Sequence, residues 1–248
     1  MEHAVEIPIA VDKLTKSFGK QRVLNGLSLK IDSGSTLSIL GRSGTGKSVF
    51  LKLLIGLQKP DSGSVTVLGR EITHLALSEL NQVRKRVGFL FQQAALYDSL
   101  TVEQNVEFPL SRHTDLKESD RRKKARELLA GVGLEGDLEK MPSEISGGMQ
   151  KRVGLARALA LDPEILLFDE PTSGLDPITS TEIGRLIAEL KKQRKLTAVV
   201  VTHDLRVARL FSERFVLIHE GAAVVEGSYE DLQKSRNEVV VQFLKDGE

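Results

Sequence analysis

Short apolar runs recur along the chain, and several of them end at glycine or at polar residues. The clearest runs are followed by Gly41, Asp169 and His203, and they cover Thr36–Leu40, Ile165–Phe168 and Thr197–Thr202. Their length and continuity predict buried strands of a parallel sheet. Because ligand sites gather at the carboxyl ends of such strands, we expect the three loops to face one crevice.

The rest of the pattern predicts helices and a second sheet around these strands. Residues 49–57 are apolar on nearly every side, as in a buried helix, whereas residues 119–130 carry a charged, solvated face. The segment from about 94 to 161 lacks a long strand pattern, so we interpret it as a helical subdomain inserted in an α/β core. Near the amino terminus, β patterns over Ala10–Leu14, Leu27–Ile31 and Ser64–Leu68 predict a small flanking antiparallel sheet. We expect residues 1–248 to form a single domain.

Composition narrows the class of protein. The 248 residues are 40% hydrophobic and include no cysteine, which excludes disulfides and thiolate metal sites. The 35 basic and 34 acidic residues nearly cancel, so no overall field favours nucleic acid as a partner. Residues 1–12 lack the pattern of a secretory signal, and no apolar stretch is long enough to span a bilayer. We expect a cytoplasmic chain that reaches a membrane only through another protein.

A glycine-rich segment between a predicted strand and a predicted helix matches the phosphate-binding P-loop pattern. It consists of Gly41, Arg42, Ser43, Gly44, Thr45, Gly46, Lys47 and Ser48. Its backbone N–H groups would surround phosphate oxygens, Lys47 would reach the β- and γ-phosphates, and the Ser48 hydroxyl would bind magnesium. A glycine-rich turn without a ligand is the alternative, and the flanking strand and helix argue against it. The loop alone predicts nucleoside triphosphate binding, which kinases, GTPases and motors share.

Polar residues at the ends of three other apolar runs have matching chemistry. We expect Asp169 to hold magnesium, mostly through water, and Glu170 to act as general base toward the attacking water. Gln92 follows Phe91 and would contact magnesium and that water, although the adjacent Gln93 leaves the register open. His203 would lie near the γ-phosphate. The alternatives are an exposed acidic pair and a structural histidine.

A second segment also suits a phosphate. Ser146 is a good N-cap for a helical pattern that runs through Ala160, and the next residues leave N–H groups bare at the helix start; the segment comprises Ser146, Gly147, Gly148, Met149 and Gln150. Since one nucleotide needs one such cradle, we expect a head-to-tail homodimer in which each Ser146 closes over the partner's nucleotide.

Together, six ordered segments resemble the Walker A, Q-loop, signature, Walker B, D-loop and H-loop motifs of ABC ATPases. They are Gly41–Ser48, Gln92, Ser146–Gln150, Ile165–Glu170, Ser173–Asp176 and His203. The resemblance implies a P-loop NTPase core, with the flanking antiparallel and inserted helical parts inferred above, that binds ATP and magnesium and hydrolyses ATP. It also implies that Asp176 contacts nucleotide and that Phe18 stacks on adenine, where tyrosine is more usual.

A finer resemblance, to the ATPase of MCE-type (Mla-like) lipid transporters, lies in Gly41–Lys52, Phe91–Val102 and Ser146–Met149. It implies integral membrane permease subunits, an MCE-domain protein and a peripheral place on the inner face of the cell membrane. The small and apolar residues 94–102, directly after Gln92, predict a surface groove for a short permease helix, with at least one of Ala95, Tyr97 and Leu100 in contact with the permease. The alternative is that Leu96, Tyr97 and Leu100 pack inside the helical subdomain. Three alternatives stay open: an ABC transporter ATPase for another substrate, a soluble ABC ATPase without a transport role, and a small-molecule kinase.

Overall fold

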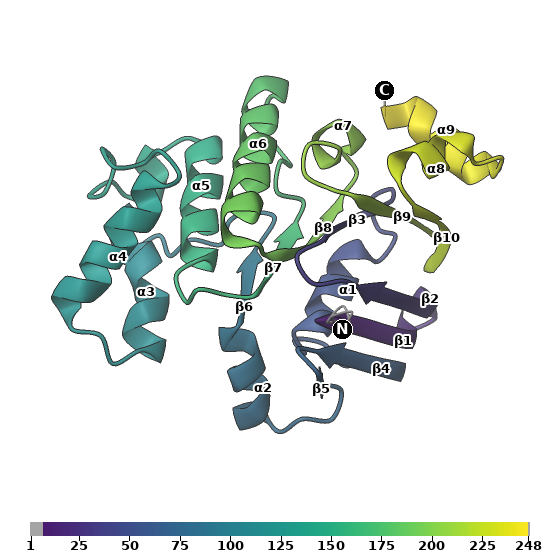
Figure 1. Cartoon of the computed structure of the whole chain (residues 1–248), viewed down its shortest axis with the longest axis horizontal. Coiled ribbons are helices and arrows are strands. Elements are labelled where there is room, and N and C mark those ends of the chain that lie inside the picture. The colour runs from purple at the N-terminus through teal and green to yellow at the C-terminus, as the bar shows by residue number, and fades with distance from the viewer. Residues whose placement is uncertain (1–6, 248) are drawn as a thin grey trace, which may run out of the picture.

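A computed structural model describes residues 7–247, and its frame is two β-sheets (Figure 1). Residues 1–6 and residue 248 lie outside the described residues. The prediction that residues 1–12 are not a secretory signal therefore falls partly outside them. The larger sheet has six strands in the order β10-β9-β3-β8-β7-β6. All neighbours are parallel except β9 and β10. Its strands are β3 (Thr36–Leu40), β6 (Val87–Leu90), β7 (Ile165–Asp169), β8 (Thr197–Thr202), β9 (Arg214–His219) and β10 (Ala222–Gly227).

Alternate residues of the large sheet enter two separate cores. On β7, Ile165 and Leu167 face one core, whereas Leu166 and Phe168 face the other. The same alternation occurs on β8, where Val199 and Val201 are opposed to Ala198 and Val200, because successive side chains of a strand point to opposite faces. Burial on both faces explains why these strands are continuous apolar runs.

The smaller sheet is antiparallel, with strand order β2-β1-β4-β5, and it covers one face of the large sheet together with α1. Its strands are β1 (Ile9–Phe18), β2 (Gln21–Ile31), β4 (Ser62–Val67) and β5 (Arg70–Glu71). The helix after the P-loop is α1 (Lys47–Leu54). It ends three residues before Leu57, the predicted end, because Gly56 adopts a left-handed conformation with φ of 62°. Leu57 is 53% exposed. The predicted strand to Leu68 ends at Val67, because Leu68 turns to φ of 50°.

Helices dominate residues 94–161 and stand together at one end of the molecule (Figure 1). They are α3 (Val102–His113), α4 (Glu118–Ala130), the 3₁₀ turn η1 (Pro142–Glu144) and α5 (Gly147–Ala158). The Ser146 hydroxyl caps α5 by accepting from the Met149 N–H at 3.3 Å, as predicted, and α5 ends two residues before the predicted Ala160. The extent of a subdomain, 94–161, stays an interpretation.

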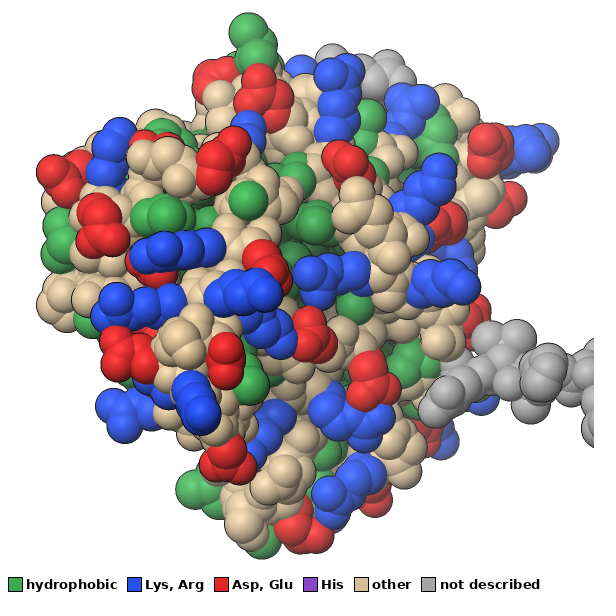
Figure 2. Space-filling view, turned by 60° about the vertical axis from the view of Figure 1, so that its left-hand side comes forward, with side chains coloured by type: hydrophobic (Ala, Val, Ile, Leu, Met, Phe, Trp, Pro, Cys, Tyr) green, Lys and Arg blue, Asp and Glu red, His purple; other side chains and the backbone are tan. Residues whose placement is uncertain are grey.

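The charged face of α4 is neutralised by neighbouring acids. Arg126 pairs with Glu103 at 2.8 Å and Arg121 with Glu107 at 3.0 Å. Figure 2 shows blue and red side chains interspersed over this side of the molecule. The remaining helices are α2 (Leu77–Lys85), α6 (Pro177–Arg194), α7 (Leu205–Ala208), α8 (Tyr229–Lys234) and α9 (Glu238–Gly247). Within residues 7–247, none of the helices combines the length and hydrophobicity needed to cross a membrane.

Helix α5 packs closely on strand β6 at two glycines. A Cβ atom on Gly88 of β6 would stand 2.3 Å from the Ala158 carbonyl oxygen. A Cβ atom on Gly154 of α5 would stand 2.7 Å from a methyl carbon of Leu90. Glycine is therefore required at Gly88, where a Cβ atom would meet backbone of the helix.

We expect Gly88→Ala to lower the free energy of unfolding by about 1–3 kcal/mol, the usual cost of overpacking a close contact. Urea unfolding at fixed pH measures it. Gly136→Ala is the matched control, because a Cβ atom there meets nothing within 4 Å, and its effect should stay below about 0.5 kcal/mol. Equal stability of the two variants would contradict this close packing.

Candidate nucleotide site

The P-loop connects β3 to α1 and is shaped by its glycines. Gly46 is the N-cap of α1 with φ of 95°, and a Cβ atom on it would stand 2.7 Å from the Val23 carbonyl oxygen of β2. Glycine is therefore needed at this residue for both conformation and space. The loop also folds around Lys47, whose ammonium donates to the carbonyls of Gly41 at 2.7 Å and Arg42 at 2.9 Å.

Lys47 is only 5% exposed and faces the residue predicted as general base. Its Nζ lies 3.4 Å from Glu170 Oε1. Burial lowers the pKa of Lys47 below its usual value, and the Glu170 carboxylate opposes that shift. A buried ammonium in a glycine loop is suited to neutralising phosphate charge.

Ser48 and Asp169 form a compact pair of oxygen ligands. The Ser48 hydroxyl donates to Asp169 Oδ1 at 2.7 Å. Burial raises the pKa of Asp169, and this hydrogen bond opposes the rise. Hydroxyl, carboxylate and amide oxygens are the hard donors that magnesium prefers, so these residues and Gln92 fit that ion. Within residues 7–247 there is no cluster of three His, Cys, Asp or Glu side chains suited to a metal.

Glu170 has the backbone geometry often found at functional residues. Its φ is 46°, a left-handed conformation that is unfavourable for a residue with a side chain. The carboxylate is nevertheless well held, because Oε2 lies 2.9 Å from His203 Nδ1 and accepts from the His203 N–H at 3.3 Å. The His203 side chain is 63% exposed and the Glu170 side chain only 10%, so the imidazole is on the solvent side of this pair.

Gln92 reaches the same place from the end of β6. Its amide donates to the Ser173 hydroxyl at 3.2 Å, in the turn that follows Glu170. A cavity of about 310 Å³ joins these segments. It is lined by Arg42, Ser43, Gln92, Glu170, His203, Phe243, Asp246 and Gly247. The loops after β3, β6, β7 and β8 therefore meet at one edge of the sheet, as expected from the sequence.

Of the P-loop, only Arg42 and Ser43 line this cavity, and Lys47, Ser48 and Asp169 lie outside its lining. The predicted contacts of the signature segment, Asp176 and Phe18 also lie outside it. Gly147 and Gly148 face α6 and the turn before it, since their Cβ atoms would meet Leu175 and Thr179. The Gln150 amide donates to the Pro142 carbonyl at 2.9 Å, and the Asp176 carboxylate caps α6 by accepting from Ile178 and Thr179 N–H groups. Phe18 ends β1 and is 47% exposed, and the Lys16 ammonium lies over its ring, 5.5 Å from the centroid. Roles for these residues and for Ser146 stay predictions.

Two features of the site escape the sequence patterns. The carboxyl-terminal helix α9 supplies Phe243, Asp246 and Gly247 to the cavity, and Asp246 pairs with Arg42 at 2.7 Å. Nothing in the α9 sequence signals that position. Lys151, on α5, is buried between the loops of Gln92 and Glu170 and is hydrogen-bonded to both backbones. Its place five residues after Ser146 is the only available signal.

This fold and this site define a P-loop nucleoside triphosphatase with a helical segment between the glutamine loop and the carboxylate strand. A family model described as ABC transporter matches residues 24–173. The chain belongs to the ABC transporter family and is an ABC-type ATPase.

Individual relatives agree with this family. The chain is 46% identical, over 96% of its length, to the Mycobacterium tuberculosis protein named "Probable ribonucleotide transport ATP-binding protein mkl" and spans 66% of that relative. It is 40% identical to the Haemophilus influenzae intermembrane phospholipid transport system ATP-binding protein MlaF, with 96% of this chain and 90% of MlaF covered. The solved dimeric cassette MJ0796, in a post-hydrolysis state bound to ADP and Pi, has a TM-score of 0.82 and 37% identity, covering 89% of this chain and 98% of the other.

Proposed function

We propose that the chain is the ATP-hydrolysing subunit of a membrane transporter that moves lipid, working as a homodimer beneath permease subunits. The observation that carries the catalytic part is that Gln92, Glu170 and His203 line one cavity at the sheet edge. The buried Lys47 ammonium lies behind it, 3.4 Å from Glu170 Oε1. The transporter part is supported by the family. The chain would then lie in the cytoplasm, peripheral on the inner face of the membrane.

Hydrolysis at this site needs a base, a charge clamp and a positioned water. Glu170 would accept a proton from the attacking water while the bond between the γ-phosphorus and the β–γ bridging oxygen breaks, giving ADP and phosphate. Lys47 and the loop N–H groups would hold the phosphates, and His203 would orient the Glu170 carboxylate. Magnesium, held by Ser48, Asp169 and Gln92, would supply charge neutralisation on the phosphates.

A homodimer accounts for the signature segment outside the cavity. Ser146, Gly147 and Gly148 sit at the amino terminus of α5, where free N–H groups favour a phosphate, but they do not line this chain's own cavity. A partner's nucleotide is therefore the proposed ligand, shared across a two-fold interface. The dimeric state of MJ0796 supports this arrangement.

Lipid is the proposed cargo because of MlaF, which shares sequence over 90% of its length. The Mkl name points instead to ribonucleotides, so a transporter ATPase for another substrate is the second candidate. An ATPase subunit need not touch the cargo, and the two candidates differ in the permease. Reconstitution with the permease and an MCE-domain protein, with transfer of labelled phospholipid as the readout, distinguishes them; failure of transfer despite ATP hydrolysis would favour the second.

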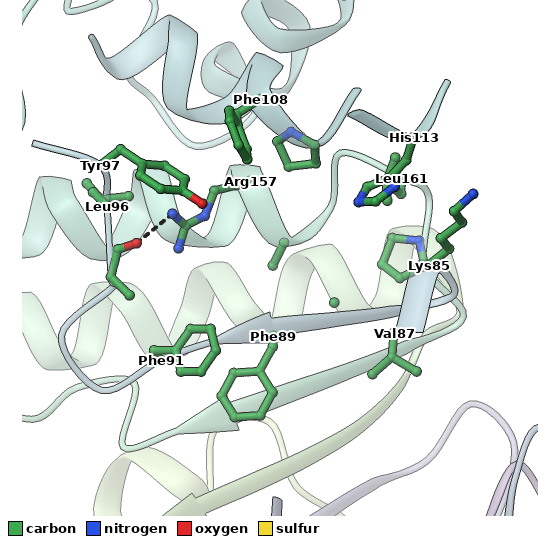
Figure 3. Close-up of a pocket in the computed structure, with 15 residues that line it drawn as sticks. Lys85, Val87, Phe89, Phe91, Leu96, Tyr97, Phe108, His113, Arg157 and Leu161 are labelled. Carbon is green, nitrogen blue, oxygen red and sulfur yellow. Dashed lines mark hydrogen bonds between the residues drawn. The ribbon is translucent and has the colours of Figure 1, made fainter. Parts of the chain in front are cut away.

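A groove between β6 and the helical segment is the proposed permease contact (Figure 3). It encloses about 540 Å³. Tyr97 and Phe108 pack with ring centroids 4.7 Å apart on one side, and Phe89 and Phe91 stack at 4.2 Å on the other. Ala95 and Tyr97 line the groove as the sequence predicts for the permease contact, but Leu100, also expected there, does not. Such an apolar groove suits a short amphipathic helix of a membrane subunit.

We expect Tyr97→Asp to abolish co-purification with the permease while the purified subunit keeps at least about half of its basal ATPase rate, because Tyr97 is 47% exposed and outside the nucleotide cavity. Leu57→Asp is the matched control, since Leu57 is 53% exposed and does not line the groove. A folded Tyr97→Asp variant that still co-purifies at the wild-type level would remove this groove from the proposal.

A further inference from the structure

Lys151 lies where a lysine is costly. It is 5% exposed, in the second turn of α5, and it donates to main-chain carbonyl oxygens rather than to a carboxylate. One of these is the Gln92 carbonyl; the other is the Glu170 carbonyl, at 3.3 Å. Burial lowers the pKa of Lys151, and the Asp169 and Glu170 charges oppose that shift. A desolvated ammonium at such a site needs a compensating role.

The two carbonyls belong to the residues whose placement matters most for hydrolysis. The Glu170 backbone is held on two further sides: its N–H donates to the Val201 carbonyl at 2.9 Å, and its carbonyl accepts from the Ser173 N–H at 3.1 Å. These contacts maintain a backbone with φ of 46°. A strained residue persists only when its surroundings over-determine it. Lys151 is the contact that comes from the helical segment.

We propose that Lys151 is a positioning residue for ATP hydrolysis: its ammonium joins the Gln92 and Glu170 carbonyls and so fixes the general base relative to the glutamine loop. Its two hydrogen bonds are to backbone carbonyls, so it would act through the backbone. Because Ser146 is the N-cap of α5, the same ammonium connects the base to the helix that follows the signature serine. This inference rests on the proposed function, in which Glu170 is the base.

A second cation of α5, Arg157, contacts the loop after β6 but not the Glu170 backbone, so it is a useful comparison for Lys151. Arg157 donates to the carbonyls of Ala94 at 2.5 Å and Ala95 at 2.7 Å, two and three residues after Gln92 in the same loop. Arg157 therefore holds the loop, whereas Lys151 holds the loop and the base. The distinctive consequence of losing Lys151 is a misplaced Glu170 with the phosphate loop intact.

The first test compares wild type, Lys151→Met and Lys151→Arg in steady-state ATP hydrolysis. Methionine fills similar volume without donors, and we expect kcat to fall about 10-fold to 100-fold, as for a small misplacement of a catalytic group. The Kd for Mg-ATP should stay within about three-fold of wild type, since the lost interaction serves the transition state. Lys151→Arg keeps charge and donors and should recover most of kcat. Lys124→Met, which loses an exposed ion pair with Asp162, is the control and should hydrolyse normally.

The second test is a double-mutant cycle with Glu170→Gln. If Lys151 acts through Glu170, Lys151→Met should change the residual rate of Glu170→Gln by less than about two-fold, whereas a general structural defect would multiply the two losses. Multiplying losses, an unchanged kcat in Lys151→Met, or parallel loss of Mg-ATP binding would each overturn the inference. Should Lys151→Met fail to fold, Lys151→Gln, which keeps one amide donor group, is put through the same cycle. Absence of ATP hydrolysis by wild type would instead overturn the proposed function.

Discussion

Glu170→Gln is expected to lower kcat for ATP hydrolysis by about 10²-fold to 10⁴-fold, the range for losing a general base. The amide keeps the shape of the carboxylate and can still meet His203, now 2.9 Å from Oε2, but it cannot accept the proton of the attacking water. Nucleotide binding should persist, because Lys47 and the P-loop N–H groups are unchanged. The variant should accumulate an ATP-bound dimer.

Phosphate release measures kcat, and size-exclusion chromatography with and without Mg-ATP measures the dimer. Glu164→Gln is a suitable control, because Glu164 is a half-exposed acid that pairs with Arg86 outside the nucleotide cavity. It should hydrolyse ATP at close to the wild-type rate. Wild-type turnover in Glu170→Gln would mean that another group takes the proton, and the mechanism above would be wrong.

Lys47→Ala is expected to weaken Mg-ATP binding by at least about 100-fold, since charge-assisted contacts to phosphate in a buried site are among the strongest polar interactions. Lys47 also organises its own loop through the Gly41 and Arg42 carbonyls, so the variant loses both the ligand for the phosphates and part of the loop's support. Equilibrium binding of a fluorescent ATP analogue measures the effect. Affinity close to wild type would exclude Lys47 from phosphate binding.

Mixing Lys47→Ala with Ser146→Arg tests sharing of the site between two chains. Ser146→Arg should bind nucleotide as an isolated subunit and fail in hydrolysis, because Ser146 serves the partner. In the mixed dimer one composite site would carry both lesions and the other neither. Recovery of part of the ATPase rate on mixing supports the shared site, and no recovery at any ratio counts against it.

The sequence was most informative where local chemistry and local structure coincide. The predicted strands at 36–40 and 197–202 coincide with β3 and β8, because buried parallel strands are continuous apolar runs. Gly41–Ser48, Gln92, Asp169, Glu170 and His203 could be assigned to one crevice, because parallel strands present their carboxyl ends at the same edge.

Contacts between distant segments could not be predicted in this way. Lys151 looks in sequence like any basic residue of a helix, and only the tertiary structure places its ammonium on the Gln92 and Glu170 carbonyls. The same holds for Asp246, whose contact with Arg42 spans most of the chain. The sequence also contained no sign that glycine is required at residue 88, because the requirement comes from the Ala158 carbonyl of helix α5.

The single helix α5 touches three functional regions along its length of about 18 Å. Its N-cap, Ser146, is the serine proposed to face the partner's nucleotide; it carries Lys151 in its second turn and ends with Arg157 and Ala158 at the groove. Helix α5 packs closely against β6 at Gly88 and Gly154. If the permease binds the groove as proposed, thermodynamic linkage requires that any factor by which the permease changes nucleotide affinity through α5 is also the factor by which nucleotide changes permease affinity. Permease binding and ATP binding would then be coupled, so that a change in one would shift the equilibrium of the other.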